Sequence, residues 1–217
     1  MDGNRRWAKD KGLASFEGHA AGYQKVKEVA EWVKDAGISH AILYAFSTEN
    51  WKRKQEEVEY LLSLFSVVIK EFTQEIAEGK HIGTRIRFMG DLSLFSNELQ
   101  KEIHELETLT EENTARVLAI ALSYSGREEI LQAARALQVH GGEITEETFS
   151  QALWSKDFPD PDLIIRTGGE QRLSNFLPWQ SVYSELIFTK TYWPALEHLE
   201  FMEMLAEYAR RVRNFGV

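Results

Sequence analysis

Three short segments of the sequence combine residues whose types and spacing suit the binding of phosphate groups and of a metal ion. The first consists of Asp2-Gly3-Asn4-Arg5-Arg6-Trp7, with Gly18-His19 shortly after it. Its two arginines offer forked donors to phosphate oxygens, Gly3 allows close backbone approach, and Asp2 is a hard oxygen ligand for Mg²⁺. The alternative is a charged, disordered chain end. His19 alone is more typical of a helix start than of a ligand.

The second segment is Phe46-Ser47-Thr48-Glu49-Asn50-Trp51-Lys52-Arg53. In a functional interpretation, Asn50 orients a substrate and Arg53 pairs with a diphosphate. In a purely structural interpretation, the segment is a strand end followed by a helix start, with Ser47 or Thr48 as the N-cap and Glu49 favourable to the helix dipole. The residues of this segment leave both interpretations open.

The third segment runs from Ile165 to Asn175 and contains Arg166, Gly168-Gly169, Arg172, Leu173 and Ser174. A strand that runs into two glycines, with arginines and a hydroxyl nearby, has the components of an anion cradle made of backbone and side chains. An arginine at the end of an apolar strand is poorly placed unless a negative group meets it. The alternative is a surface turn with solvated arginines.

Hydrophobic spacing predicts the elements that position these segments. Helical spacing occurs in Gly18–Ala36, Val58–Ile76, Leu99–Leu106, Ile130–Leu137 and Phe201–Val212, and Thr145 is the predicted N-cap of a further helix. Short apolar runs predict strands at Ala41–Phe46, Ile86–Met89, Val117–Leu122, Leu163–Ile165 and Leu186–Phe188. This alternation predicts an α/β fold, with a mainly parallel central β-sheet flanked by helices, in a single domain over residues 1–217. Ligands of such sheets bind at the carboxyl ends of the strands, where the polar segments lie.

Composition narrows the class of protein. The net charge of −9 argues against a nucleic-acid binder, so an anion site must be a local basic cluster. The absence of cysteine removes disulfides, thiolate catalysis and cysteine-ligated zinc. The N-terminus does not resemble a signal peptide and no apolar run reaches the length of a membrane span. The expected location is the cytoplasm, with at most a peripheral membrane contact.

Common nucleotide and metal motifs are missing from the sequence. There is no G-x-x-x-x-G-K-[ST], no G-x-G-x-x-G and no H-E-x-x-H. Asp157, Asp160 and Asp162 have a spacing similar to an aspartate-rich Mg²⁺ motif, but Pro159 and Pro161 interrupt any helix there. We interpret these aspartates as part of a turn.

Taken in order, several blocks resemble the signatures of the cis-prenyltransferases of the undecaprenyl diphosphate synthase type. They are Met1–Ala8, Gly18-His19, Phe46–Trp51 with Arg53, Ser125-Gly126-Arg127, Arg166–Glu170 with Arg172–Phe176, and Tyr183 with Glu185-Leu186. The blocks span nearly the whole chain.

The resemblance implies a Mg²⁺-dependent enzyme that condenses isopentenyl diphosphate with an allylic prenyl diphosphate, such as farnesyl or geranyl diphosphate. The product would be a Z-polyprenyl diphosphate such as undecaprenyl diphosphate. The resemblance also implies a homodimer, a hydrophobic tunnel between sheet and helices for the growing chain, and peripheral membrane contact for product release.

Residue roles follow from the same resemblance. Asp2 and Asn50 are the implied catalytic residues, and Asp2 and Glu185 the implied metal-associated carboxylates. The allylic diphosphate would be bound by Gly3, Asn4, Arg5, Arg6, His19 and Arg53. Isopentenyl diphosphate would be bound by Arg166, Arg172 and Ser174. The remaining implied substrate-binding residues are Trp7, Ser47, Thr48, Glu49, Trp51 and Leu173, with Trp51 beside the reacting carbons.

The sequence departs from the family at several positions. Arg5 stands where glycine is usual, Ser15 where arginine is usual, and Ser123 where asparagine is usual. Family members also carry an apolar strand before the Asp2 block, whereas the present sequence starts at Met1. One alternative function is a non-catalytic structural subunit of a heteromeric cis-prenyltransferase, and another is a phosphate-binding α/β module without transferase activity.

Overall fold

The computed structural model describes residues 1–211 of the chain. Two compact units form within it, one from residues 1–32 together with residues from 160 onward, and the other from residues 33–159. The strands of both units pair in parallel. The α/β class with a parallel sheet is therefore confirmed, whereas the single domain over residues 1–217 and the hydrophobic tunnel remain predictions.

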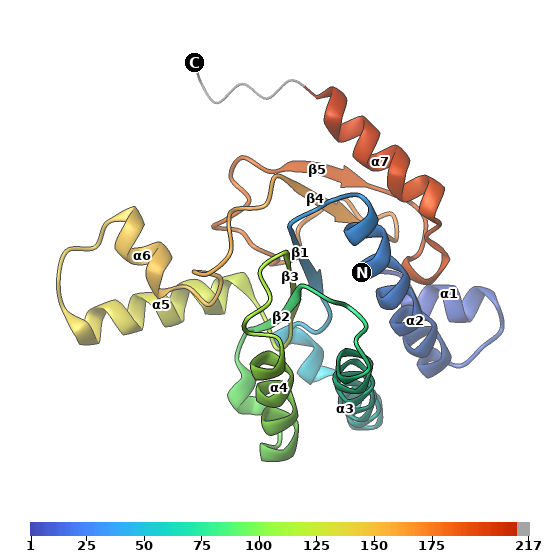
Figure 1. The fold of residues 1–217 in the computed structure, drawn as a ribbon, viewed down its shortest axis with the longest axis horizontal. Coiled ribbons are helices and arrows are strands. Elements are labelled where there is room, and N and C mark those ends of the chain that lie inside the picture. The colour runs from blue at the N-terminus through green and yellow to red at the C-terminus, as the bar shows by residue number, and fades with distance from the viewer. Residues whose placement is uncertain (212–217) are drawn as a thin grey trace. The chain divides into compact units, whose positions relative to one another are not determined.

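The first unit contains a parallel strand pair and the helices at the two ends of the chain (Figure 1). Its elements are α1 (Asn4–Asp10), α2 (Ser15–Asp35), β4 (Leu163–Arg166), β5 (Glu185–Phe188), the short 3-10 helix η3 (Trp193–Ala195) and α7 (His198–Arg210). Leu163 pairs with Glu185 and Arg166 with Phe188. Both strands therefore end at the same edge of the pair. At this edge, β4 continues into the segment that begins at Thr167.

Two glycines on α2 allow α1 to approach it closely. A Cβ atom on Gly18 would lie 2.2 Å from the main-chain oxygen of Asn4, and one on Gly22 would lie 2.2 Å from Asn4 Oδ1. Trp193 Nε1 donates a hydrogen bond of 2.7 Å to the main-chain oxygen of Gly22. The Gly18 and Gly22 positions thus fix the place of the N-terminal segment on α2.

The second unit is built on a three-stranded parallel sheet (Figure 1). The strands, in spatial order, are β1 (His40–Tyr44), β3 (Arg116–Ala121) and β2 (Thr84–Met89). The helices are η1 (Thr48–Lys52), α3 (Gln55–Ala77), η2 (Leu92–Leu94), α4 (Asn97–Leu109), α5 (Gly126–His140) and α6 (Glu146–Ala152). α3 packs against α4, α4 against β2, and α5 against α6. Tyr44, Ala121 and Met89 end the three strands in register.

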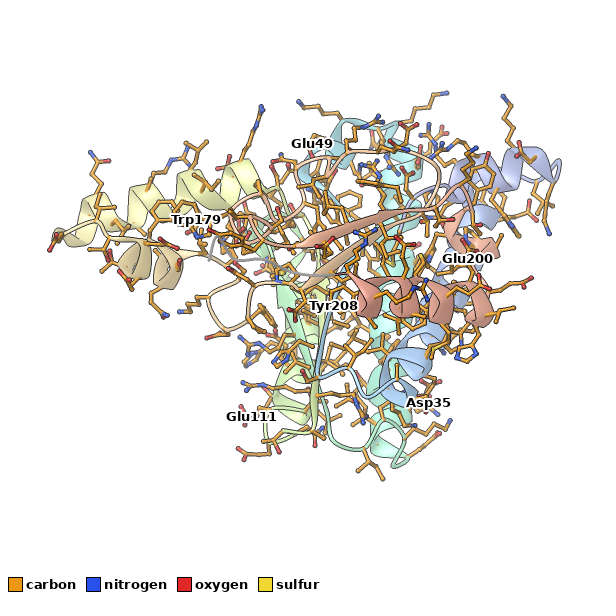
Figure 2. The ribbon with its side chains drawn as sticks, turned by 90° about the horizontal axis from the view of Figure 1, so that it is seen from above. Asp35, Glu49, Glu111, Trp179, Glu200 and Tyr208 are labelled. Carbon is orange, nitrogen blue, oxygen red and sulfur yellow. The ribbon has the colours of Figure 1, made fainter. Side chains whose placement is uncertain are left out.

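One face of α3 is buried, and the opposite face is exposed. Val58, Leu61, Ile69 and Phe72 are buried, whereas Val67 is 50% exposed. Charged side chains at the ends of elements, such as Asp35 and Glu111, are exposed (Figure 2). No helix within residues 1–211 is both long and apolar enough to span a membrane.

The expected helices and strands are confirmed to within a few residues of their predicted ends. Thr145 is the N-cap of α6, since its side chain accepts a hydrogen bond from Thr148 N, and Gly141 follows the end of α5 with φ 69°. The interpretation of the N-terminus as disordered is wrong, because Asn4–Asp10 forms α1. Val212, the last residue of the predicted terminal helix, lies outside the described residues.

Candidate functional site

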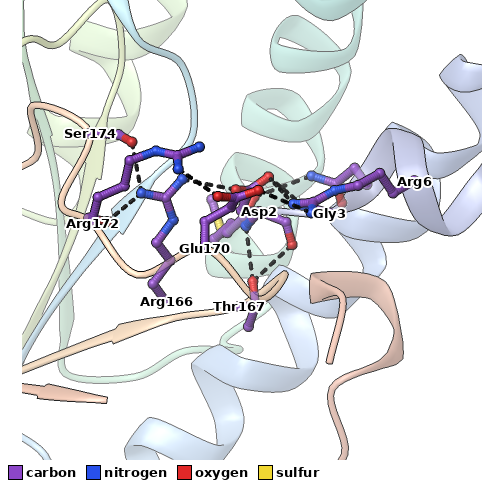
Figure 3. Close-up of polar contacts among 10 residues, drawn as sticks. Asp2, Gly3, Arg6, Arg166, Thr167, Glu170, Arg172 and Ser174 are labelled. Carbon is purple, nitrogen blue, oxygen red and sulfur yellow. Dashed lines mark hydrogen bonds and ion pairs between the residues drawn. The ribbon is translucent and has the colours of Figure 1, made fainter. Parts of the chain in front are cut away.

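The Asp2 carboxylate lies between two arginines in the first unit (Figure 3). Its Oδ1 accepts a hydrogen bond of 2.7 Å from Gly3 N and lies 3.2 Å from Arg6 Nη2. Its Oδ2 lies 3.0 Å from Arg166 Nη2. The first and third of the sequence segments therefore meet at this carboxylate.

Thr167, the residue after β4, holds the backbone of Asp2. The Thr167 hydroxyl accepts a 2.9 Å hydrogen bond from Asp2 N and donates one of 2.9 Å to the main-chain oxygen of Asp2. Trp193 N donates a further hydrogen bond of 2.9 Å to that oxygen. Because Thr167 is only 2% exposed, these bonds fix Asp2 at the carboxyl end of β4.

The surroundings of Asp2 favour its ionised form. Burial acts to raise the pKa of the carboxyl group, but the hydrogen bond from Arg166, the charge of Arg6 and the hydrogen bond from Gly3 N outweigh it. The pKa of Asp2 therefore lies below its usual value. At neutral pH the site holds a carboxylate, the form that can bind a metal ion.

Arg166 also organises the segment that follows it. Its Nη1 donates to the main-chain oxygen of Arg172 and, at 2.7 Å, to Ser174 Oγ. Ser174, Asn175 and Leu177 have φ values of 48°, 69° and 49°, in the left-handed region. Such conformations bend the chain sharply and are uncommon for residues other than glycine. The bend brings Ser174 back to the guanidinium group of Arg166.

A second carboxylate, that of Glu170, joins the cluster. It accepts a hydrogen bond of 2.5 Å from Arg172 Nη1 and lies 3.6 Å from Arg6 Nη1. Three arginines thus face two carboxylates, which leaves a net positive charge of one in a chain whose net charge is −9. The predicted local basic cluster is therefore present in the first unit.

The two glycines of the third segment do not form the predicted backbone cradle. Gly168 N donates to the main-chain oxygen of Thr191 and Gly169 N to that of Thr189, both at 2.8 Å. Both donors are thus already used within the protein, and these two amides are not available to an anion. Gly168 instead makes room, because a Cβ atom there would lie 2.7 Å from Arg6 Nη2.

The second segment forms a compact turn in the second unit. Ser47 N donates to Asn50 Oδ1 at 3.1 Å and Asn50 N donates to the main-chain oxygen of Ser47 at 3.0 Å. The predicted strand end and helix start are therefore present, with η1 as the helix. Arg53 Nη1 lies 2.9 Å from Glu57 Oε1. Trp51 Nε1 donates to Ser123 Oγ at 3.0 Å.

A family model described as "Putative undecaprenyl diphosphate synthase" matches residues 1–216. An isoprenyl transferase of Thermotoga maritima is 43% identical over 100% of this chain and 94% of the relative. This chain belongs to the undecaprenyl diphosphate synthase family. Cis-prenyltransferase 7 of Solanum lycopersicum is 41% identical to this prenyltransferase, over 100% of the chain and 78% of the relative. The structure of lavandulyl diphosphate synthase from Lavandula x intermedia, in complex with dimethylallyl diphosphate, matches with a TM-score of 0.94 and 34% identity, covering 100% of this chain and 95% of the other.

The two carboxylates implied as metal ligands are not brought together in this prenyltransferase chain. Glu185 begins β5 beside Leu163 and is paired with Arg211 at 2.6 Å. Thr167, which holds Asp2, comes four residues after Leu163, a distance of about 13 Å along an extended chain. Within residues 1–211 there is also no group of three or more His, Cys, Asp or Glu residues that could hold a metal ion.

The other predicted residues of the N-terminal segment have different surroundings. The side chain of Asn4 packs against α2, with its Oδ1 buried beside Gly22 and without a hydrogen-bond partner among the described residues. His19 is half-buried on α2, and Arg5 is exposed on α1. Trp7 lies beneath Lys11, whose Nζ is 4.7 Å from the ring centre.

The sequence alone indicates no individual role for Thr167, Glu170 or Ser123. A hydroxyl residue directly after a strand was the available signal for Thr167, but its bonds to Asp2 connect residues 165 positions apart. Glu170 is adjacent to the glycine pair, but its ion pairs with Arg6 and Arg172 depend on the fold. Ser123 departs from the family in the sequence, but its contact with Trp51 depends on the fold.

Proposed function

We propose that this prenyltransferase condenses isopentenyl diphosphate with an allylic prenyl diphosphate to give a Z-polyprenyl diphosphate. The observation that carries the proposal is the ionised Asp2 carboxylate between Arg6 and Arg166, joined to the end of β4 through Thr167. Membership of the family supports the same reaction class.

The arginines would act on the diphosphate groups. Arg166 and Arg172, with the Ser174 hydroxyl, have donors suited to the isopentenyl diphosphate oxygens. Arg6 and Arg53 are proposed to bind the allylic diphosphate; these two residues belong to different units, and their joint role rests on the family resemblance. As the allylic carbon–oxygen bond breaks, negative charge accumulates on the departing diphosphate, and fixed guanidinium groups stabilise that charge.

The residues around Asp2 fit a magnesium ion that is held by a single protein carboxylate. Mg²⁺ is commonly bound by one or two carboxylates together with substrate phosphates and waters, and Asp2 is ionised and 37% exposed. When bound, the ion would supply further neutralisation of the diphosphate charge. Glu185 fits this site less well, since its carboxylate is paired with Arg211 at the other end of the strands.

Asn50 is proposed to orient substrate and not to accept the proton that is lost after bond formation. Its side-chain oxygen already accepts the hydrogen bond from Ser47 N, which leaves the amide NH₂ group as the free end. An amide nitrogen donates hydrogen bonds and is a poor base. A diphosphate oxygen or the Asp2 carboxylate is chemically better suited to receive the proton.

The proposed assembly is a homodimer in the cytoplasm, with peripheral membrane contact during product release. Light scattering checks the dimer, for which the expected mass is near twice 25.0 kDa. A candidate membrane surface lies between α1 and α2, where Leu13 is 38% and Phe16 52% exposed. Lys9 and Lys11 are exposed beside them, and apolar side chains next to lysines are typical of surfaces that contact anionic lipid.

The deciding experiment supplies purified protein with Mg²⁺, labelled isopentenyl diphosphate and an allylic primer, and measures extracted lipid. Wild-type protein should form labelled polyprenyl product, and Asp2→Ala should lower turnover by about 100-fold or more, because a group that stabilises charge in the transition state is removed. Asp10→Ala, which removes an exposed carboxylate at the end of α1, is the matched control.

No product from wild-type protein alone, with activity appearing only after a second subunit is added, would favour the structural-subunit alternative. Near-normal turnover of Asp2→Ala at saturating Mg²⁺ would reject the role of Asp2. Circular dichroism of both variants confirms that any loss of activity is not a loss of fold.

A further inference from the structure

Ser123 is a buried residue in a strained conformation, two residues beyond the end of β3. It is 0% exposed, and its φ of 48° lies in the left-handed region, where residues other than glycine and asparagine are uncommon. Its main-chain oxygen accepts a hydrogen bond of 3.2 Å from Asp91 N. Such strain persists only where the surroundings enforce it, and it is often associated with a functional requirement.

The hydroxyl of Ser123 provides a polar contact inside an aromatic cluster. Trp51 Nε1 donates to Ser123 Oγ at 3.0 Å. The Trp51 ring lies 5.2 Å from that of Phe46 and 5.4 Å from that of Phe95, measured between ring centres. Ring contacts alone leave an indole some freedom to slide and tilt, whereas a hydrogen bond to its N–H has a defined direction. Ser123 therefore determines how the Trp51 ring sits in the cluster.

The backbone beyond Ser123 also holds the segment that carries Asn50 and Trp51. Tyr124 N donates to the main-chain oxygen of Phe46 at 3.1 Å, and Thr48 N donates to that of Tyr124 at 3.2 Å. The Tyr124 side chain is itself fixed, since its hydroxyl donates to the fully buried Glu129. These hydrogen bonds connect the chain after β3 to the backbone of the segment that carries Trp51. The Ser123 hydroxyl adds a connection to the Trp51 side chain.

We propose that Ser123 is a positioning residue that sets the orientation of the Trp51 indole and, through it, the rate of the transferase reaction. The proposal rests on the proposed function and on the family resemblance, which implies that Trp51 lies beside the reacting carbons. Reaction rates are sensitive to small displacements of groups that orient substrates. Loss of the tether, the hydrogen bond from Trp51 Nε1 to Ser123 Oγ, should therefore lower kcat.

Ser123→Gly separates positioning from stability. Glycine adopts the left-handed conformation without strain, and this gain offsets the lost hydrogen bond, so the melting temperature should stay near that of wild type. The hydroxyl is lost, and kcat should fall by about 10-fold, the effect equivalent to one hydrogen bond. Ser123→Asn should recover most of that rate, since asparagine tolerates the left-handed region and its side-chain oxygen can accept the Trp51 hydrogen bond.

Trp51→Phe provides the matched background, because it removes the indole donor and leaves Ser123 in place. Adding Ser123→Gly to Trp51→Phe should change kcat by less than about 2-fold if the two residues act through one bond. An equal loss in both backgrounds, or an unchanged kcat in Ser123→Gly alone, would overturn the proposal.

The orientation of Trp51 can also be followed by NMR in the absence of substrate. This measurement does not depend on whether the proposed function is correct. The indole ¹H–¹⁵N resonance of Trp51 can be assigned by its disappearance in Trp51→Phe. In Ser123→Gly it should shift and exchange faster with solvent, and an unmoved resonance would show that no tether exists. If the resonance responds but wild-type protein forms no labelled lipid, the proposed function and the effect on kcat fail while the tether stands.

Discussion

The ionisation of Asp2 is linked to the stability of the folded chain. Its pKa in the folded protein lies below the ordinary value of about 3.9. A carboxyl group with a lowered folded-state pKa stabilises the fold above its unfolded-state pKa, and this contribution is lost as pH falls through the folded-state pKa. The stabilising contribution of Asp2 is therefore complete at neutral pH and decreases below about pH 4.

Asp2→Asn provides the test of this linkage. The free energy of unfolding of wild-type protein, measured by urea titration, should exceed that of Asp2→Asn at pH 7, and the difference should shrink below about pH 4. Asp10→Asn, at an exposed position on α1, should show no such convergence with wild type. A difference between wild type and Asp2→Asn that is constant from pH 7 to pH 3 would contradict the interpretation.

Substitution of Arg172 and of Arg53 should weaken the binding of different substrates. Arg172→Ala should weaken isopentenyl diphosphate binding by about 10- to 150-fold and allylic binding little, because charge-assisted hydrogen bonds contribute about 1.5 to 3 kcal/mol. Arg53→Ala should weaken allylic binding and also lower kcat, since its partner gains charge as it departs. Equilibrium titration with an unreactive thio-analogue of the allylic substrate measures both affinities.

Arg135→Ala is a suitable control for this pair. Arg135 lies on α5, is 66% exposed and is paired with Glu128, so its removal changes the net charge without touching the proposed binding residues. Equal losses of both ligands in Arg172→Ala and Arg53→Ala would indicate one undivided anion pocket, and the assignment of separate binding residues would have to be withdrawn.

The sequence predicted the regular elements well because burial leaves a periodic signal in long helices and buried strands. The stripe from Val58 to Ile76 corresponds to α3, and the apolar run from Val117 to Leu122 to β3. α1 escaped prediction because it has only seven residues, of which one, Ala8, is buried. A short polar helix carries no apolar period, so its existence depends on contacts with α2 that are distant in sequence.

The close approach of Asn4 in α1 to α2 leads to a counterintuitive prediction for Gly22. Replacing a glycine by alanine within a helix ordinarily stabilises it by up to about 1 kcal/mol. Here the new Cβ atom would lie 2.2 Å from Asn4 Oδ1, so Gly22→Ala should instead lower the free energy of unfolding by about 1 to 3 kcal/mol. Urea unfolding measures the change.

Asn4→Ala combined with Gly22→Ala tests the proposed cause. The double variant should regain part of the stability lost in Gly22→Ala, because the oxygen that the new methyl group meets is gone. A matched variant is Gly18→Ala, whose Cβ would meet the main-chain oxygen of Asn4 and should therefore not be rescued by Asn4→Ala. A Gly22→Ala protein more stable than wild type would contradict the account.

At the scale of the whole molecule, composition predicted that any anion site must be a local exception to the charge of −9. The cluster of Arg6, Arg166 and Arg172 is that exception. What composition could not predict is that Asp2 and Glu170 would stand among these arginines, because their pairing depends on where β4 ends relative to the N-terminal segment. Charge counts indicate that a site exists, and the fold determines which charges remain available to a ligand.

The last prediction concerns the apolar surface between α1 and α2 and its proposed contact with lipid. Phe16 is 52% exposed, and burial of that exposed half contributes about half of the 1.5 to 3 kcal/mol for full burial, equivalent to roughly 4- to 13-fold in binding. Phe16→Glu should therefore reduce co-sedimentation with phosphatidylglycerol vesicles strongly. Ile82→Glu, at a residue that is 81% exposed in the other unit, adds the same charge elsewhere and should bind like wild type.

The charges beside this surface add a second, separable expectation. Lys9 and Lys11 should make binding stronger to anionic than to neutral phosphatidylcholine vesicles, with the difference reduced at high salt, although Asp10 and Glu17 offset part of the positive charge. The Glu17 carboxylate accepts a hydrogen bond of 2.8 Å from Ala14 N, which keeps it on the loop backbone. Equal loss of vesicle binding in Phe16→Glu and Ile82→Glu would show that the added negative charge repels the vesicle wherever it is placed. The α1–α2 surface would then not be the part of the protein that contacts the membrane.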